Sequence, residues 1–269
     1  MSTITLTTDF GTSDHYVAAM KGVLLTVAPH ATIVDITHVI RPQDVVHAAF
    51  VFRHAFPYFP EGTVHVVVVD PGVGTSRRLL AARYAGQVVL APDNGILSMV
   101  HHDFPLEALH EVANRRWFIQ EQSPTFHGRD ILAPVAGHLA CGDPLEEVGP
   151  QTDHLEILNL ADPAGEPGGP LRGFILHIDH FGNLVTNIRQ ADMVSYRAGM
   201  KDAASGRPRE PLIFVGETGV GPLRRTYADV AEGELLALIG SADLLEIAVN
   251  SGSAAARLRA LPGEAVFVQ

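Results

Sequence analysis

The feature that most constrains the fold is a run of largely β-branched residues, TVHVVVV, at positions 63–69, in which five of the seven residues are valine. A strand buried on one face alternates apolar and polar residues, so an unbroken apolar run indicates a strand covered on both faces. Asp70 ends the run, and a Pro-Gly-Val-Gly loop and then Arg77 follow it. Ligands bind beyond the carboxyl ends of strands in open α/β sheets, so this acid marks a candidate site.

The residues around this run predict an α/β domain with a largely parallel central sheet. Short strands are expected at 3–7 and 31–36, and Ser13 is a candidate cap for a helix between them that Pro29 ends. Strands that alternate with helices favour this layered arrangement. The apolar face of the helix is expected to carry Val17, Met20, Leu24 and Val27. Further expected elements are a helix from Pro42, strands at 79–84 and 87–91, and a helix at about 129–140.

The composition changes after the first domain. Residues 159–171, NLADPAGEPGGPL, are too rich in proline and glycine for a packed element, so we assign 1–158 to an N-terminal domain and 159–171 to a linker. Residues 172–269 contain short strand-like runs separated by turn-forming residues, which predicts a smaller, mostly β C-terminal domain. A loop is expected within it at 198–211. The strand-like runs are GFILHID, NLVTNI, PLIFVG, ELLALIG and EAVFVQ.

Composition and charge exclude several classes of function. The chain has 269 residues, of which 46% are hydrophobic and 18% charged, as in globular proteins. Its formal net charge of -11 argues against nucleic-acid binding, which needs a clustered basic face. Cys141 is the single cysteine, and the sequence shows neither the pattern of a signal peptide nor a membrane-spanning apolar run. We therefore expect a cytoplasmic protein with a small-molecule ligand and no membrane or nucleic-acid partner.

Asp70, Arg77 and His127 are the side chains best suited to catalysis. His127 lies within TFHGRD, between an aromatic residue and Gly128, just before a predicted helix. An acid, a guanidinium and an imidazole together can orient and deprotonate a water molecule. The residues alone leave open a structural alternative, in which Asp70 caps a turn, Arg77 forms an exposed ion pair and the histidine is structural.

Two further segments are candidate ligand contacts. Asp9 follows the first strand and is placed to accept hydrogen bonds from the vicinal hydroxyls of a ribose, or else it forms an Asx turn. In IDHFGN, at 178–183, Phe181 is suited to cover a planar heterocycle while Asn183 binds its polar edge. The alternative, which the chemistry alone favours, is a hairpin with Phe181 in the core.

Two other patterns do not predict cofactor sites. GVGTSR is close to a dinucleotide-binding fingerprint, but Arg77 occupies the third glycine position, where a side chain blocks close helix packing. His101, His102 and Asp103 are adjacent in sequence and lack the spacing of metal ligands on a helix. We therefore expect neither a dinucleotide nor a metal cofactor.

Taken together, the motifs TDFG, DPGVGTSRR, PDNG, TFHGRD, IDHFGN and SADLLEIAVNSGSAA resemble those of the S-adenosylmethionine hydroxide adenosyltransferase family, also called S-adenosylmethionine hydrolases. The resemblance spans nearly the whole chain and keeps the order of the motifs. It implies an α/β N-terminal domain, a smaller β-barrel-like C-terminal domain, and the fold of the fluorinase and chlorinase enzymes. It also implies a homotrimer whose active sites lie at subunit interfaces.

The resemblance further implies hydrolysis of S-adenosylmethionine to adenosine and L-methionine, by in-line attack of activated water on the ribose C5′ and without a cofactor. Asp70, Arg77 and His127 match the residues that handle the water. The residues that match substrate contacts are Asp9 for the ribose, Phe181 and Asn183 for the adenine, and Asp179 and Ser241 for the amino-acid end.

Two departures from the related halogenases bear on the reaction. Those enzymes have Phe-Tyr-Ser where this chain has Phe126, His127 and Gly128, so the serine that helps to hold fluoride is missing and halogenation is disfavoured. The arginine that follows the serine matched to Ser241 is Ala242 here. The other functions considered are a non-catalytic sensor of adenosine or S-adenosylmethionine, and a halogenase.

Overall fold

The computed structural model describes residues 2–165, 169–199 and 210–269. The chain divides into two compact units, Met1–Asn159 and Leu160–Gln269, called unit 1 and unit 2 below. Each unit has hydrophobic core clusters of its own, so the two are described in turn.

Unit 1 is built on a six-stranded β-sheet. Its strands are β1 (Thr3–Thr8), β2 (Thr32–Thr37), β3 (Val64–Val68), β4 (Leu79–Tyr84), β5 (Gln87–Pro92) and β6 (Leu106–Glu111). The spatial order is β2-β1-β3-β5-β4-β6. The first four strands in this order pair in parallel, whereas β4 pairs antiparallel with β5 and β6. The largely parallel α/β domain expected from the sequence is confirmed.

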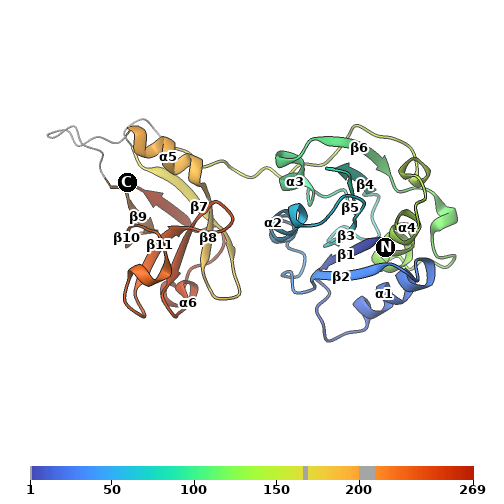
Figure 1. The fold of residues 1–269 in the computed structure, drawn as a ribbon, viewed down its shortest axis with the longest axis horizontal. Coiled ribbons are helices and arrows are strands. Elements are labelled where there is room, and N and C mark those ends of the chain that lie inside the picture. Colours follow the sequence, from blue (N-terminus) through green and yellow to red (C-terminus); the bar gives the residue numbers. More distant parts are fainter. Residues whose placement is uncertain (1, 166–168, 200–209) are drawn as a thin grey trace. The chain divides into compact units, whose positions relative to one another are not determined.

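Helices cover both faces of this sheet, as Figure 1 shows. They are α1 (Tyr16–Val27), α2 (Val45–Ala55), α3 (Ser98–Asp103) and α4 (Ala133–Ala140). Along β3 the side chains alternate between two cores. Val64, Val66 and Val68 pack with residues of α1 and α4, whereas Val67 and Val69 pack with residues of α2 and α3. Burial on both faces therefore explains why valine occupies consecutive positions here.

Two helix starts differ from those expected. Ser13 does not cap α1, because the helix begins only at Tyr16 and its N-cap residue makes no side-chain capping hydrogen bond. The helix expected from Pro42 begins instead at Val45. Its cap is Asp44, whose side chain accepts a hydrogen bond of 2.9 Å from a backbone N–H in the first turn. The sequence pattern predicts neither α3 nor β6.

The helix expected at about 129–140 is interrupted near its start. Gly128–Leu132 forms a π-helical turn before α4 begins. Pro134 has no N–H, so it cannot bond the carbonyl of Asp130, four residues earlier. That carbonyl instead accepts a hydrogen bond of 2.9 Å from the backbone N–H of Ile119. The π-helical turn is thereby tied to the loop that precedes it.

Unit 2 contains a closed β-barrel with the strand order β10-β11-β12-β8-β7-β13-β9. These strands are β7 (Leu171–Ile178), β8 (Leu184–Arg189), β9 (Leu212–Val215), β10 (Thr218–Arg224), β11 (Leu235–Ile239), β12 (Leu244–Val249) and β13 (Ala265–Val268). Neighbouring strands pair antiparallel, except β10 and β11, which pair in parallel. The β-barrel-like C-terminal domain implied by the resemblance is confirmed.

Unit 2 also contains the short helices α5 (Gln190–Gly199) and α6 (Ala254–Leu258), which the sequence pattern does not predict. The pattern also misses β12 and β10, and β10 contains glycine and proline, which are poor strand formers. The loop expected at 198–211 begins inside α5, and its residues 200–209 lie outside the described part of the chain. None of the helices that the structure describes has the length and apolar character needed to cross a bilayer.

Candidate active site

Asp9 and Asp70 lie at the same edge of the sheet in unit 1. Asp9 directly follows β1, and one residue separates Asp70 from the end of β3. The two strands pair in parallel, with Thr8 opposite Val68, so their carboxyl ends meet at this edge. Ligands bind at this edge in open α/β sheets.

Arg77 contacts both of the other residues expected to handle water. Its Nε donates to the two carboxylate oxygens of Asp70 at 2.9 Å, and its Nη2 also contacts that carboxylate. The same Nη2 donates to Nδ1 of His127 at 2.8 Å. The side chains of Arg77 and Asp70 are only 10% and 7% exposed. Three residues from two separate segments therefore form one hydrogen-bonded group, called the triad below.

The loop between Asp70 and Arg77 lies against the segment that carries His127. Gly74 in this loop has a φ of +81°, and a Cβ at this position would lie 2.9 Å from the carbonyl oxygen of Pro124. Glycine avoids both the left-handed backbone penalty and this collision. The close approach of the two segments depends on Gly74.

His127 follows a residue that is held among aromatic rings. Phe126 packs edge-on against Phe10 and Tyr16, with ring centroids 5.7 and 5.4 Å apart. The guanidinium of Arg129 lies 4.8 Å from the centroid of the Phe126 ring. These contacts fix the backbone next to His127 and so restrict where its imidazole can lie.

The surroundings of His127 decide its protonation. Burial and then the positive charge of Arg77 lower the pKa of His127 below its usual value of 6.5, while Asp70 and Asp130 oppose this shift. The imidazole is therefore neutral at pH 7. A guanidinium only donates hydrogen bonds, so Nδ1 is the acceptor in the contact with Arg77 and the proton is on Nε2. The basic nitrogen of His127 thus faces the guanidinium.

Asp9 is held by a contact that the sequence does not predict. The backbone N–H of Gln43 donates to Oδ2 of Asp9 at 2.8 Å. Gln43 has a φ of 65°, in the left-handed region that most residues avoid. The Asx-turn alternative is wrong, because the N–H of Gly11, two residues after Asp9, donates to the carbonyl of His38 at 2.7 Å. The carboxylate of Asp9 is oriented from outside its own turn.

In unit 2, Asp179, Phe181 and Asn183 occupy the turn between β7 and β8. Oδ1 of Asp179 accepts from the backbone N–H groups of the other two residues at 2.9 and 2.8 Å, and Oδ2 accepts from the Asn183 amide at 2.9 Å. The turn leaves Phe181 73% exposed, so the alternative that places this ring in the core is wrong. An exposed ring on a tightly bonded turn is suited to stack on a planar ligand.

A polar pair that the sequence analysis missed lies near Asp179. The hydroxyl of Tyr227 donates to a carboxylate oxygen of Glu246 at 2.6 Å. Burial raises the pKa of Glu246, and the charge of Asp179 adds to this effect. Glu246 is the one acid in the buried strand β12, LLEIAV, and this is the signal that marks it in the sequence. Ser241 lies in the exposed turn before this strand.

The histidines at 101 and 102 point to different partners. Nδ1 of His101 lies 3.4 Å from the hydroxyl of Tyr84, and Nε2 of His102 lies 4.0 Å from Asp103. Within 2–165, 169–199 and 210–269, no group of three or more histidine, cysteine, aspartate or glutamate side chains is placed to hold a metal ion.

A pocket of about 550 Å³ opens beside the triad. Arg77, Arg78, Asp93 and Asn94 are among the residues that line it. Of the triad, Arg77 is among the residues that line this pocket, whereas Asp70 and His127 are not.

Both units match domains of one known family. The SAM hydroxide adenosyltransferase N-terminal domain matches residues 4–149, and the SAM hydroxide adenosyltransferase C-terminal domain matches residues 173–267. The chain belongs to the SAM hydroxide adenosyltransferase family. The family resemblance found in the sequence motifs is thus confirmed.

Curated relatives of this adenosyltransferase-family protein have two kinds of name. An (R)-S-adenosyl-L-methionine hydrolase from Salinispora tropica is 39% identical over 98% of this chain and 97% of its own length. One from Thermus thermophilus is 39% identical over 91% of this chain and 91% of its own length. A fluorinase from an Actinoplanes species is 33% identical over 85% of this chain and 92% of its own length. The chain is thus similar to hydrolases and to fluorinases.

Solved structures of similar sequence share the fold of this family member. The crystal structure of a conserved protein from Thermotoga maritima has a TM-score of 0.88 and 37% identity, and the match covers 99% of this chain and 100% of that one. A conserved protein from Thermus thermophilus has a TM-score of 0.77 and 36% identity, with full coverage of both chains at 100%.

The close approach of the two loops predicts a difference between two glycine substitutions. Gly74→Ala and Gly62→Ala both place an alanine in the left-handed region, with φ of +81° and +80°, but only Gly62 has no atom within 4 Å of the added Cβ. We expect Gly62→Ala to lower the free energy of unfolding by about 1 kcal/mol. Gly74→Ala should lower it by at least about 1 kcal/mol more, in urea denaturation. Equal losses would contradict the contact with Pro124.

Proposed function

We propose that this protein hydrolyses (R)-S-adenosyl-L-methionine to adenosine and L-methionine. The observation that carries the proposal is the triad, in which Arg77 bonds Asp70 and His127 at the carboxyl edge of the sheet. The names of the curated hydrolases, which are 39% identical to this chain over nearly its full length, support it.

The chemistry of the substrate sets what the protein must supply. Water attacks the ribose C5′ as the C5′–S bond breaks, and the bonding electron pair passes to sulfur. The sulfonium leaves as the neutral thioether of methionine, so no general acid is needed. Water is a weak nucleophile at neutral pH, so catalysis must orient it and remove its proton.

We assign these tasks to the triad. Arg77 holds the water oxygen through its guanidinium and favours the developing hydroxide, because the guanidinium stays protonated. Asp70 fixes the guanidinium through the paired hydrogen bonds. We assign the base to Nδ1 of His127, which is reached when the water enters between the imidazole and Arg77. Asp70 is the alternative base, and the variants below distinguish the two.

The substrate contacts are assigned from the family resemblance. Asp9 would hold the ribose hydroxyls, since its carboxylate is fixed at the same sheet edge as the triad. Phe181 and Asn183 would hold the adenine, and the exposure of the Phe181 ring supports this. Asp179 and Ser241 would hold the amino-acid end. We also propose that a homotrimer completes each site with the unit 2 residues of another copy, and that no metal or other cofactor takes part.

Incubation with the substrate in ¹⁸O-labelled water tests this function. We expect adenosine in large molar excess over protein, with the label in its 5′ hydroxyl and none in methionine. Adenosine that never exceeds the protein concentration would instead indicate a sensor. A 5′-halogenated nucleoside formed when chloride or fluoride is added would indicate a halogenase. Loss of turnover in chelator would contradict the absence of a metal.

Removal of the imidazole should affect turnover more than binding. We expect His127→Ala to lower kcat by at least ~100-fold, the scale of general-base assistance, with substrate affinity nearly unchanged. Steady-state kinetics and calorimetric titration measure the two. His102→Ala is the matched control, because the His102 side chain is 66% exposed and should leave both quantities unchanged. A near-normal kcat in His127→Ala would remove His127 from the mechanism and favour Asp70 as the base.

The lowered pKa of His127 predicts the acid limb of the pH profile. The imidazole must be neutral to accept a proton, and its pKa lies below 6.5 because of burial and Arg77. We expect kcat to be level near pH 7 and to fall only below pH 6.5, as His127 becomes protonated. Residual turnover in His127→Ala should lack this limb. A limb that persists in this variant would assign it to another group.

A further inference from the structure

The sequence motif PDNG, at 92–95, has no role in the chemistry proposed above. It begins at the last residue of β5, the strand that lies between β3 and β4 in the sheet. Strand β3 ends two residues before Asp70, and β4 begins two residues after Arg77. The PDNG turn is therefore placed between the two ends of the loop that carries the acid and the arginine of the triad.

Consecutive residues of this turn bond the two ends of the loop. The side-chain amide of Asn94 donates to the carbonyl of Val69 at 2.9 Å, directly before the acid of the triad. The backbone N–H of Asp93 donates to the carbonyl of Arg78 at 3.0 Å, directly after the arginine of the triad. The span between the acid and the arginine is thus set by one rigid turn.

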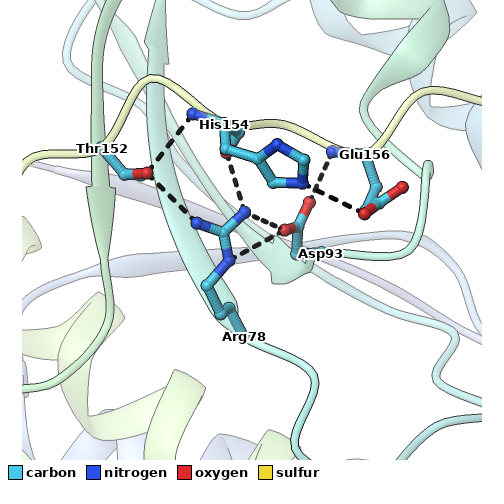
Figure 2. A network of polar contacts seen from close by, with 5 residues as sticks. All are labelled: Arg78, Asp93, Thr152, His154 and Glu156. Carbon is cyan, nitrogen blue, oxygen red and sulfur yellow. Dashed lines mark hydrogen bonds and ion pairs between the residues drawn. The ribbon is translucent and has the colours of Figure 1, made fainter.

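The Asp93 side chain is itself held in a network of polar contacts, which Figure 2 shows. Its carboxylate is 4% exposed and pairs with the guanidinium of Arg78. That guanidinium also donates to the hydroxyl of Thr152 at 3.1 Å and to the carbonyl of His154 at 2.9 Å. The other carboxylate oxygen accepts from the backbone N–H of Glu156 at 2.8 Å. An ion pair whose carboxylate is buried and has this many partners resists displacement.

The segment that supplies these partners also covers the turn. Gly95 has a φ of +90°, and a Cβ at this position would lie 2.7 Å from the side chain of Leu158. The backbone N–H of Leu158 donates to the hydroxyl of Ser98 at 2.8 Å. The turn is therefore enclosed between the sheet and the 152–158 segment.

We propose that Asn94 and the Arg78–Asp93 ion pair are positioning residues for the triad. The inference rests on the proposed hydrolysis, because it assigns these residues to that reaction without contact with the reacting atoms. Arg77 must stay bonded to Asp70 and close to Nδ1 of His127, so that one water molecule can lie between them; without that water the two contacts are 2.9 and 2.8 Å. A displacement of about 1 Å in such a group can lower the rate by about 100-fold. Both flanks of the loop must therefore be held.

The test compares Asn94→Ala with wild type and with Ser98→Ala. Asn94→Ala removes the bond to Val69, and the weaker bond of 3.2 Å from the backbone N–H of Ile96, without a change of charge. Ser98→Ala is the matched control, because it removes the hydroxyl's bonds to Leu158 and to the carbonyl of Gly95 in the same turn but leaves the bonds to both ends of the loop in place. If Asn94→Ala does not fold, Arg78→Lys replaces it, since lysine keeps the charge but lacks the planar fork that spans these partners.

Two readouts distinguish positioning from general stability. We expect Asn94→Ala to lower kcat by at least ~10-fold with KM changed less than ~3-fold. We also expect NMR titration to show a higher pKa for His127. Loss of the bond to Val69 shifts Asp70 together with its partner Arg77, and Arg77 lowers this pKa by more than Asp70 raises it, while Asp130 stays in place. Ser98→Ala should show neither change, even if it melts at a lower temperature.

The proposal requires both changes in a folded variant. An unchanged kcat or an unchanged pKa of His127 in Asn94→Ala would overturn it, as would the same pair of changes in Ser98→Ala. A wild-type protein that makes no adenosine would overturn the proposed function instead. The titration of His127 would then decide the positioning role by itself, since it needs no turnover.

Discussion

The site depends on the hydrogen bonds that the guanidinium of Arg77 donates. They join the carboxylate of Asp70 and the imidazole of His127, at 2.9 and 2.8 Å. These two residues are 57 positions apart in the chain and belong to different segments. The Arg77 side chain is only 10% exposed, so removing either the acid or the arginine would leave a poorly solvated charge. Burial lowers the pKa of His127, and the same guanidinium charge lowers it further. One side chain thus sets the geometry of the group and contributes to its protonation.

The sheet supplies the rigidity that this interaction needs. The parallel pairing of β1 with β3 brings Asp9 and Asp70 to one edge, and β5 ends between the flanks of the loop that carries Arg77. Asn94 holds the start of that loop through its bond to Val69, and close packing at Gly74 holds the loop against Pro124. Functional groups on loops are most precise when strand ends hold both flanks, because the sheet core cannot shift without losing buried contacts.

The sequence predicts those parts of the structure that depend on local residue types. The apolar run before Asp70 predicted a doubly buried strand, and residue types singled out the triad. The sequence does not predict features that depend on contacts with distant segments of the chain. The exposure of Phe181, the left-handed backbone of Gln43 and the bond from Asn94 to Val69 depend on tertiary placement, which no local pattern encodes. The missed strand β10 is likewise stabilised by its barrel neighbours in spite of its glycines and proline.

A double-mutant cycle between Arg77 and His127 tests the central claim most directly. The single variants Arg77→Ala and His127→Ala are compared with the double variant by single-turnover kinetics of adenosine formation. If the two side chains act on one water molecule, the double variant should be little slower than the slower single variant, as for residues that act as a unit. Losses that multiply in the double variant would mean that the two act independently, and would contradict the account.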